Sequence, residues 1–281
     1  MSLPWSYRAG RTLLQALSTL RATRPGPEEL ALPALVLAPH KDDETLGAGA
    51  TILRKIQAGA AVKVLFFTDG RNSHPGRMAP EDLVERRTRE TREAARVLGL
   101  GPEDLIFLEL EDGRLEGQME QAVQGAQAAL EAFRPREVYL PYRFEPQEDH
   151  EAAWKASIQA LRRSGGSYLV REYPVWFWFR WPWVPLPRPA LRERPRRLGK
   201  ALAGAWRFLR DFDTMVPTDG FLDNKRKALA CYVTQTTRME DDPRWVTLGD
   251  VGDGEFLRCF FGEAEVFHSY SLGTGWKDSR E

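Results

Sequence analysis

The sequence predicts an α/β fold, a Rossmann-like three-layer α/β/α arrangement around a mostly parallel sheet. Short apolar runs alternate with longer segments of helical spacing about four times between residues 34 and 161, which is typical of βαβ units. The runs are continuously apolar, as in strands buried on both faces of a sheet. Polar residues gather directly after the runs, where parallel sheets bind their ligands.

The first run, ALVLA at residues 34–38, ends in the polar segment 39–44. Similar runs occupy 62–67, 105–108 and 138–140, and the helical segments are 45–57, 80–98, 118–133 and 151–161. Three of the four histidines fall in the loops that follow the first, second and fourth runs. These loops are expected at one edge of the sheet, where they form a site.

The alternation fades after about residue 165. Residues 173–187 hold four Trp and four Pro, and residues 188–200 hold six basic residues and one acidic residue. A helix is expected over 221–233, and strands over 255–261 and 265–270 are expected to close the fold. We expect an N-terminal extension over 1–30 and a single domain over 31–281, in which 174–200 is an aromatic and basic insertion.

The composition is that of a folded globular protein, with 42% apolar and 28% charged residues. Lys and Arg together number 40 and so do Asp and Glu, which gives no reason to expect nucleic acid as a partner. The two cysteines are expected to be small buried hydrophobes and not a disulfide. The first 30 residues have apolar runs too short for a signal peptide or a membrane span, so a cytoplasmic location is expected.

The segment Pro39 to Glu44 (PHKDDE) places one imidazole and three carboxylates at the end of a buried strand. Such a cluster is costly unless a cation neutralises it, and His with carboxylate suits zinc or iron(II). The second half of the site is Gln147 to His150, which follows the fourth run. Neighbouring parallel strands would bring His150 beside His40. Helix capping by one Asp is the alternative, but it leaves the His and the second carboxylate unexplained.

An iron(II) oxygenase is a second alternative, because His40, Asp42 and His150 also match a facial triad. Those enzymes place the triad on an antiparallel double-sheet scaffold. The predicted alternation of strands and helices therefore disfavours the oxygenase.

These motifs resemble the LmbE/PIG-L family of zinc-dependent N-acetylglucosaminyl deacetylases. The resemblance rests on Pro-His-x-Asp-Asp-Glu at 39–44, on Arg-x-x-Glu at 87–90 with a following Leu-Gly, and on Asp-His-x-Ala at 149–152. It covers residues 34–165, and 225–235 looks like a later family element. The family implies hydrolysis of the N-acetyl amide of an amino sugar, which gives a free amine and acetate.

The resemblance implies a role for each matching residue. His40, Asp43 and His150 would bind one Zn²⁺ per chain, or another divalent metal. Asp42 would be the general base and then the general acid. Arg87 and Asp112 would hold sugar hydroxyls, although Arg86 leaves the arginine assignment uncertain by one residue.

Two positions depart from the family pattern. The family commonly has a second His where this chain has Gln147, and an amide can donate a hydrogen bond to an oxyanion but cannot transfer a proton. We therefore include Gln147 among the catalytic candidates, and a weakened or non-catalytic metal- or sugar-binding protein is the alternative. Lys41 replaces the usual Pro and is expected to point to solvent.

The expected partner is a small-molecule or lipid-linked amino sugar. Trp176, Trp178, Trp181 and Trp183 allow three interpretations, namely a buried strand, an aromatic platform for a sugar or an acyl chain, and a peripheral membrane contact through 174–200. His74 is expected to be a solvated loop histidine, and His268 to be structural. The sequence leaves the oligomeric state open.

Overall fold

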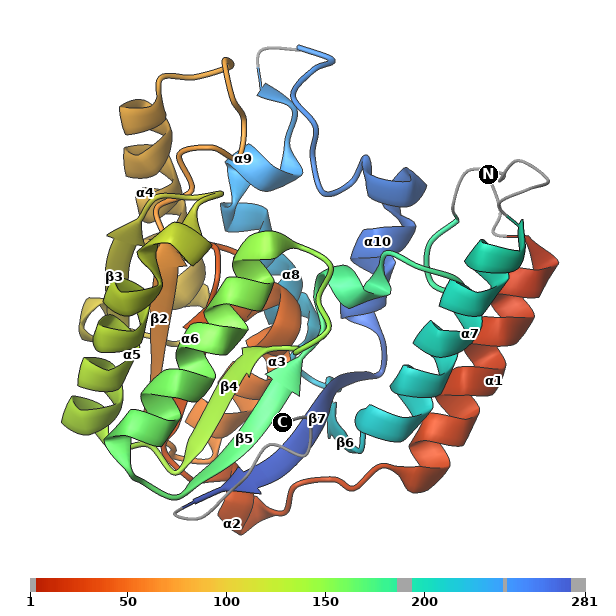
Figure 1. Cartoon of the computed structure of the whole chain (residues 1–281), viewed down its shortest axis with the longest axis horizontal. Helices are drawn as coiled ribbons and strands as arrows, with labels where there is room; N and C mark the ends of the chain where they lie inside the picture. The colour runs from red at the N-terminus through yellow and green to blue at the C-terminus, as the bar shows by residue number, and fades with distance from the viewer. Residues whose placement is uncertain (1–3, 186–193, 240–241, 274–281) are drawn as a thin grey trace.

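The computed structural model describes residues 4–185, 194–239 and 242–273, and their centre is a mixed sheet of seven strands (Figure 1). The strand order is β3-β2-β1-β4-β5-β7-β6. The strands are β1 Ala34–Ala38, β2 Val62–Thr68, β3 Leu105–Leu110, β4 Glu137–Pro141, β5 Tyr168–Tyr173, β6 Thr214–Pro217 and β7 Ala264–Leu272. The first five positions are parallel, and β7 is antiparallel to both β5 and β6. The predicted α/β fold with a mostly parallel sheet is therefore confirmed.

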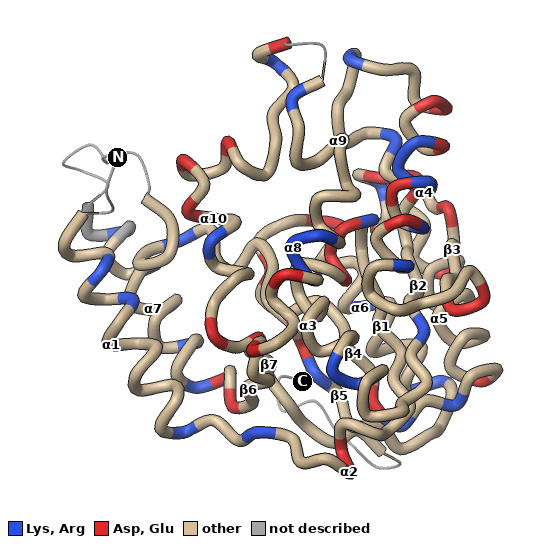
Figure 2. The backbone as a smooth tube through the Cα atoms, turned by 180° about the vertical axis from the view of Figure 1, so that it is seen from behind, with Lys and Arg blue, Asp and Glu red and all other residues tan. Residues whose placement is uncertain are grey.

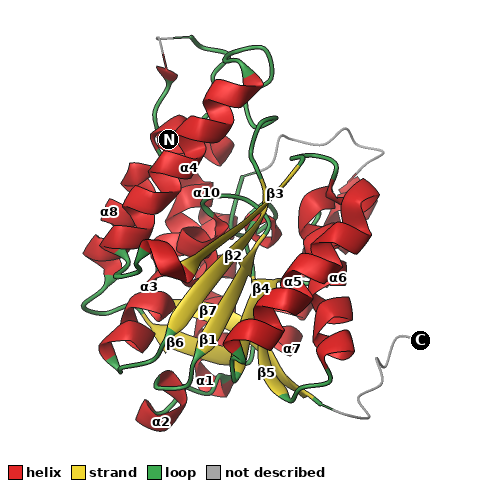
Figure 3. Cartoon of the chain, turned by 90° about the vertical axis from the view of Figure 1, so that its left-hand side faces the viewer, coloured by secondary structure: helices red, strands yellow, loops and turns green. Residues whose placement is uncertain are grey.

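Helices cover both faces of the sheet (Figure 3). The helices are α1 Trp5–Arg21, α2 Pro27–Leu30, α3 Asp43–Gln57, α4 Pro80–Val97, α5 Met119–Phe133, α6 Glu148–Ser164, α7 Arg194–Asp211, α8 Leu222–Cys231, α9 Val233–Thr236 and α10 Glu255–Arg258. Helices α5 and α6 bury Leu35 and Leu37 of β1, whereas Val36 faces the core that contains α3 and α8. Because successive strand residues point to opposite faces, an unbroken apolar run serves both cores.

Strand β5 escaped prediction because charged residues interrupt its apolar pattern. Strand β5 carries Arg171 and Glu172, both buried. Arg171 Nε donates to Glu137 Oε1 at 2.9 Å, and Arg143 Nη2 lies 2.8 Å from Glu172 Oε1. Pairing of these charges makes their burial tolerable, and a local sequence pattern does not show the pairing. The short edge strand β6 was also missed.

The prediction of a strand over 255–261 is wrong. This segment forms α10 and the 3-10 turn Cys259–Phe261. Phe256 and Phe260 are four residues apart, so a helix brings both rings together, and their centroids lie 5.1 Å apart in the core. The strand expected over 265–270 is confirmed as β7.

The aromatic segment after β5 is not a strand but a turn whose first three aromatic residues form the 3-10 helix Trp176–Trp178. Phe177, Trp178 and Trp183 are buried against Phe208 and Phe212 of α7. Residues 186–193 lie outside the described part of the chain. The segment thus ties the sheet to α7.

Charged residues of both signs are spread over the backbone (Figure 2), but several are buried in pairs. Lys225 of α8 donates to Leu46 O at 2.8 Å and to Glu265 Oε1 at 2.6 Å, which joins α8, α3 and β7. Cys231 and Cys259 are free and half-buried. Among the described residues, none of the helices has the length and apolar character needed to span a bilayer.

Candidate active site

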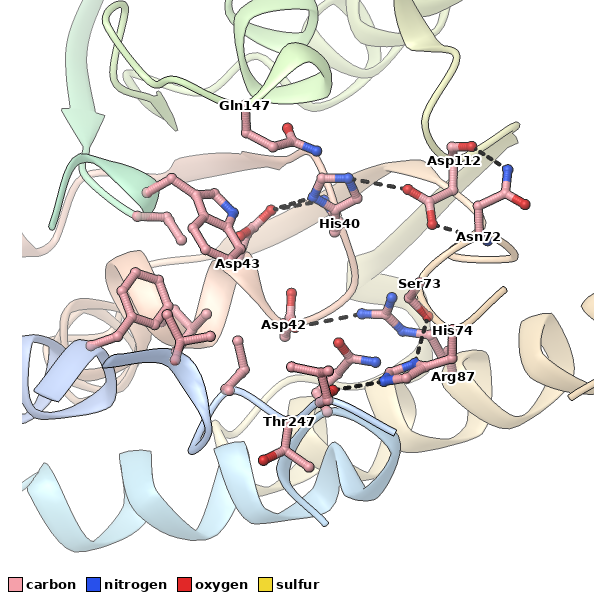
Figure 4. Close-up of a pocket in the computed structure, with 18 of the residues that line it drawn as sticks. His40, Asp42, Asp43, Asn72, Ser73, His74, Arg87, Asp112, Gln147 and Thr247 are labelled. Atoms are coloured by element: carbon pink, nitrogen blue, oxygen red, sulfur yellow. Dashed lines mark hydrogen bonds and ion pairs between the residues drawn. The ribbon is translucent and has the colours of Figure 1, made fainter. Parts of the chain in front are cut away.

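The site begins where β1 ends and α3 starts. Asp42 lies just before the first residue of α3 and has φ 143°, a conformation that L-residues seldom adopt. His40 N donates to Asp43 Oδ2 at 2.9 Å, which fixes the Asp43 side chain beside the His40 ring. The turn therefore directs three functional side chains to the carboxyl edge of the sheet, as Figure 4 shows.

His40, Asp43 and His150 converge as the sequence predicts. His40 Nδ1 lies 3.2 Å from Asp43 Oδ2, and His150 Nε2 lies 3.3 Å from the same oxygen. One ligand atom from each residue lies within 4.8 Å of the others. Both ring nitrogens of His150 are buried without a hydrogen-bond partner of acceptable geometry. Buried polar atoms normally have partners, so this nitrogen–oxygen set fits a divalent metal ion.

Carboxylates behind the two imidazoles orient them. His40 Nε2 lies 3.3 Å from Asp149 Oδ2 and 3.3 Å from Asp112 Oδ1. Asp149 also accepts backbone N–H bonds from Gly113 at 2.6 Å and Leu115 at 3.1 Å. His40, Asp112 and Asp149 form a second set of possible metal ligands, but the members of this set are already hydrogen-bonded. A carboxylate on the far nitrogen of a metal-binding His fixes the ring and raises its basicity.

Glu145 has the corresponding place behind His150. Its Oε2 lies 3.6 Å from His150 Nδ1, and the carboxylate is fully buried. Glu145 Oε1 accepts the backbone N–H groups of Val175 at 2.9 Å and Phe177 at 3.1 Å. Glu145 and Asp149 were both missed as functional residues. Asp149 precedes the motif histidine and offered a sequence signal, whereas Glu145 offered none.

The carboxylates around the His40 and His150 imidazoles favour positive charge at this place. Burial lowers the pKa of His40, but hydrogen bonds to Asp112, Asp149 and Asp43 outweigh it and raise that pKa well above its usual value. Burial raises the pKa of Asp43, but the adjacent His150 and His40 rings lower it further than burial raises it. The carboxylates thus stabilise positive charge at the imidazoles, as they would stabilise a bound cation.

Asp42 faces the cavity and is not among the three grouped ligand candidates. Burial raises the pKa of Asp42 to about 8, against the opposing effect of Arg87. Arg87 Nη2 lies 3.5 Å from Asp42 Oδ2 and also donates to Lys41 O. A carboxyl group whose pKa lies near neutrality can both accept and release a proton.

The structure distinguishes Arg87 from Arg86. Arg87 is buried and lines the cavity, whereas Arg86 pairs with Glu90, with Nε 3.5 Å from Oε1. Gly70 has φ 80°, and a Cβ there would lie 2.9 Å from Arg87 Cδ. This glycine therefore leaves room for the Arg87 side chain.

The expectation that Lys41 points to solvent is wrong. Lys41 is completely buried, and its Nζ donates to Thr88 Oγ1 at 2.7 Å and to Asp69 O at 3.1 Å. Nζ also lies 3.3 Å from Glu109 Oε2. The side chain runs beneath the loop after β2, where these three oxygens take all of its donors.

The cavity has a volume of about 380 Å³ and two unlike sides. One side is polar and the other is apolar, where the Trp176 and Phe256 rings stack with centroids 4.8 Å apart. The polar lining includes His40, Asp42, Asp43, Asn72, Ser73, His74, Arg87, Asp112 and Gln147, and the apolar lining includes Leu46, Val175, Trp176, Val246, Leu248, Val251 and Phe256. Asn72 is a cavity residue that sequence reasoning missed. Its backbone N–H donates to Asp112 Oδ2 at 3.1 Å.

His74 is not a solvated loop residue. It is buried, lines the cavity and stacks on Trp245 with centroids 4.2 Å apart. Its Nε2 lies 3.0 Å from Val246 O. The loop after β2 thus packs on the segment after α9. His268 lies away from the cavity on β7, with Nδ1 2.7 Å from Asp211 O.

Gln147 lines the cavity and also caps α6. Its Oε1 accepts the backbone N–H of His150 at 2.8 Å. Because the amide oxygen is used in the cap, the amide nitrogen is the atom left to face the cavity, where the Gln147 side chain lies near His40 (Figure 4). The arrangement supplies a neutral hydrogen-bond donor at a fixed place.

Comparisons with known proteins agree with this geometry. The model of the PIG-L family, described as GlcNAc-PI de-N-acetylase, matches residues 35–161, so the predicted resemblance is confirmed there. The uncharacterized deacetylase YaiS of Escherichia coli K12 is 26% identical over 133 residues, which cover 46% of this chain and 67% of that protein.

Two solved structures share the fold over most of the chain. N,N'-diacetylchitobiose deacetylase from Pyrococcus horikoshii has a TM-score of 0.61 at 16% identity, covering 96% of this chain and 94% of that chain. The 4-carboxy-2-hydroxymuconate hydratase GalB of Pseudomonas putida KT2440 has a TM-score of 0.58 at 14% identity, covering 89% of this chain and 100% of that chain. A hydratase shares this fold, so the reaction has to be argued from the site.

Proposed function

We propose that this chain, whose residues 35–161 match the PIG-L family model, is a metal-dependent deacetylase that hydrolyses the N-acetyl amide of an amino sugar or glycoconjugate. The products are a free amine and acetate. The observation that carries the proposal is the convergence of His40, Asp43 and His150, with unpartnered buried His150 nitrogens, beside the buried carboxyl group of Asp42.

His40, Asp43 and His150 would hold the metal, for which zinc is the first candidate. A bound zinc ion would polarise the amide carbonyl and lower the pKa of a bound water toward about 7. The protein's contribution is to keep the two imidazoles fixed, through Asp149 behind His40 and Glu145 behind His150.

Asp42 would accept the proton of the attacking water and deliver it to the leaving amine. Its burial favours the protonated form, and Arg87 favours the carboxylate, so both forms are accessible near neutral pH. Gln147 would donate its amide N–H to the developing oxyanion. Because an amide cannot carry a proton, Asp42 performs both proton transfers in this scheme.

The cavity supports a sugar as the substrate. Asp112 and Asn72 present hydrogen-bonding groups beside His40, and Arg87 contributes a buried guanidinium. On the opposite side, Trp176 offers an aromatic face of the kind on which the apolar face of a sugar ring packs. We propose that Arg87 and Asp112 hold sugar hydroxyls.

The iron(II) oxygenase alternative loses support from the geometry. Its triad needs Asp42 between the two histidines, whereas among the described residues the oxygen nearest both rings belongs to Asp43. A non-catalytic binding protein remains the competing class, motivated by Gln147.

The test measures the metal content of the purified protein beside two variants. His150→Ala removes a proposed ligand, and His268→Gln changes a histidine remote from the cavity. We expect about one zinc per chain in the wild type and in His268→Gln, a loss in His150→Ala, and release of amine from N-acetylated amino sugars only by the first two. Absence of bound metal after incubation with zinc would overturn the mechanism, and bound zinc without amine release from any N-acyl glycoside would favour the binding protein.

A further inference from the structure

Helices α1 and α7 lie at one side of the molecule (Figure 1), and both carry exposed large apolar side chains. They lie side by side and run in the same direction, and the residues that follow them, Thr23 and Thr214, form a parallel bridge. Nine large apolar side chains are exposed among the described residues, and seven of them lie on these two helices. The seven are Trp5, Leu13, Leu17, Leu20, Leu198, Leu202 and Trp206, and we call them the α1/α7 patch.

The patch follows helical spacing on each helix. Leu13, Leu17 and Leu20 are four and three residues apart on α1, where Leu14 and Ser18 form the buried side. Leu13, Leu17 and Leu20 are 60%, 38% and 84% exposed, so the row is open to solvent in the described structure, most of all at its end. An amphipathic helix normally buries its apolar side chains against the core. On α1 the leucines at 13, 17 and 20 are instead exposed to solvent, in addition to the buried Leu14.

The corresponding row on α7 is Leu198, Leu202 and Trp206, four residues apart. Arg207 stacks over Phe144 with 4.4 Å to the ring centroid, on the side of α7 that faces the sheet. At 3.6 residues per turn the apolar row lies between about 100° and 180° around the helix from Arg207. The row is therefore turned away from the sheet.

The same two helices concentrate positive charge (Figure 2). Helix α1 contains three Arg and no acidic residue, and α7 contains six basic residues and one acidic residue, Asp211, in a chain whose net charge is zero. Arg11 and Arg210 are paired with Glu255 and Asp211. Arg8, Arg21, Arg196 and Lys200 are exposed and make no ion pair with a described acidic residue.

We propose that the α1/α7 patch lies on the surface of a bilayer that contains anionic lipid. An exposed apolar row with Trp at two positions, flanked by unpaired basic side chains, is the composition of an interfacial helix. The expected contact segment 174–200 shares Arg196, Leu198 and Lys200 with this surface, whereas its Trp178 and Trp183 are 7% and 2% exposed and pack inside.

The test is cosedimentation of the full chain with vesicles of phosphatidylcholine alone and of phosphatidylcholine mixed with phosphatidylglycerol. We expect binding to the mixed vesicles that weakens as salt is added. The apolar variant Leu17→Gln/Leu202→Gln/Trp206→Gln should reduce the partition coefficient at least about tenfold. Because these residues are exposed, the thermal unfolding midpoint should change little.

Two further variants separate charge from apolar contact. Arg8→Gln/Arg196→Gln/Lys200→Gln should abolish the preference for phosphatidylglycerol, whereas the matched variant Arg89→Gln/Arg96→Gln/Arg136→Gln, at exposed positions elsewhere, should bind like the wild type. Absence of wild-type binding to the mixed vesicles, or binding as strong as that of the wild type by both the apolar and the charge variants, would overturn the proposal. Light scattering gives the alternative outcome. If the wild type formed a dimer that the apolar variant loses, and the wild type did not bind vesicles, the proposal would be overturned in favour of self-association.

Discussion

His150 and Asp42 are both buried beside the cavity, and their surroundings give them different chemistry. The His150 nitrogens have no hydrogen-bond partner of acceptable geometry, whereas Asp42 lies 3.5 Å from the Arg87 guanidinium and faces the cavity. A ligand needs a fixed lone pair, and an acid–base group needs access to substrate and a pKa near the working pH. In the proposed mechanism the adjacent residues Asp43 and Asp42 therefore divide the work, with Asp43 beside the imidazoles and Asp42 toward the cavity that would hold the substrate.

Asp42→Asn should abolish proton transfer without removing the metal. Asn has nearly the same size and shape as Asp, so this change keeps the volume of the side chain at a position with φ 143°. We expect kcat to fall about 100- to 10,000-fold, with metal content unchanged by elemental mass spectrometry. A variant that keeps more than half of the wild-type kcat would show that another group is the base.

Gln147 has two roles that substitution can separate. Gln147→Glu keeps an oxygen for the cap on His150 N but removes the N–H donor, whereas Gln147→Ala removes both. We expect kcat to fall about 100- to 1,000-fold in both variants. Only Gln147→Ala should also lose about 1 kcal/mol of unfolding free energy, measured by chemical denaturation. Equal stability of the two variants would contradict the capping role.

At the scale of elements, the site depends on how strand ends meet helix starts. Loops after β1, β2, β3 and β4 supply His40, His74, Asp112 and Gln147, and the parallel order of β3, β2, β1 and β4 brings these loops together. The segment after β5 adds Val175 and Trp176 to the cavity wall. Glu145 links this wall to His150, because it accepts backbone N–H groups from the segment and faces the imidazole.

Glu145→Gln should weaken metal binding without changing a ligand. The amide retains one acceptor oxygen for the segment at 175–177 but loses the negative charge that faces His150 Nδ1. We expect the dissociation constant for zinc, measured by competition with a chromophoric chelator, to rise about 10- to 100-fold. The matched change Glu172→Gln alters a buried carboxylate that pairs with Arg143, and it should leave zinc affinity unchanged.

At the scale of the whole molecule, the aromatic segment connects the cavity to helices α1 and α7, which carry the α1/α7 patch. Trp176 lines the cavity, Trp183 packs on Phe208 of α7, and a Cβ on Gly10 of α1 would lie 2.8 Å from Trp181 Cζ2. An enzyme held on a bilayer through α1 and α7 would meet substrates that are anchored there.

This arrangement predicts a preference for lipid-linked amino sugars. Deacetylation of an N-acetylhexosaminyl lipid in mixed phosphatidylglycerol vesicles should exceed that of the matching soluble glycoside in kcat/KM by about tenfold or more, because vesicle binding raises the local substrate concentration. The apolar variant of the α1/α7 patch should lose this advantage and keep its activity on the soluble glycoside. Equal activity on both substrates by the wild type would contradict the prediction.

The sequence by itself determined the α/β fold and five of the seven strands, β1, β2, β3, β4 and β7, because apolar runs and helical spacing are local patterns. It also located His40, Asp42, Asp43 and His150, because a dense polar motif at a strand end has few structural explanations. Only the tertiary structure decided what depends on partners distant in the chain. The buried Lys41 contacts Thr88 and Glu109, and the buried Arg171 donates to Glu137. The buried His74 stacks on Trp245. Burial of a polar side chain is decided by the group that satisfies it, and a strand order that is not the chain order brings that group into place.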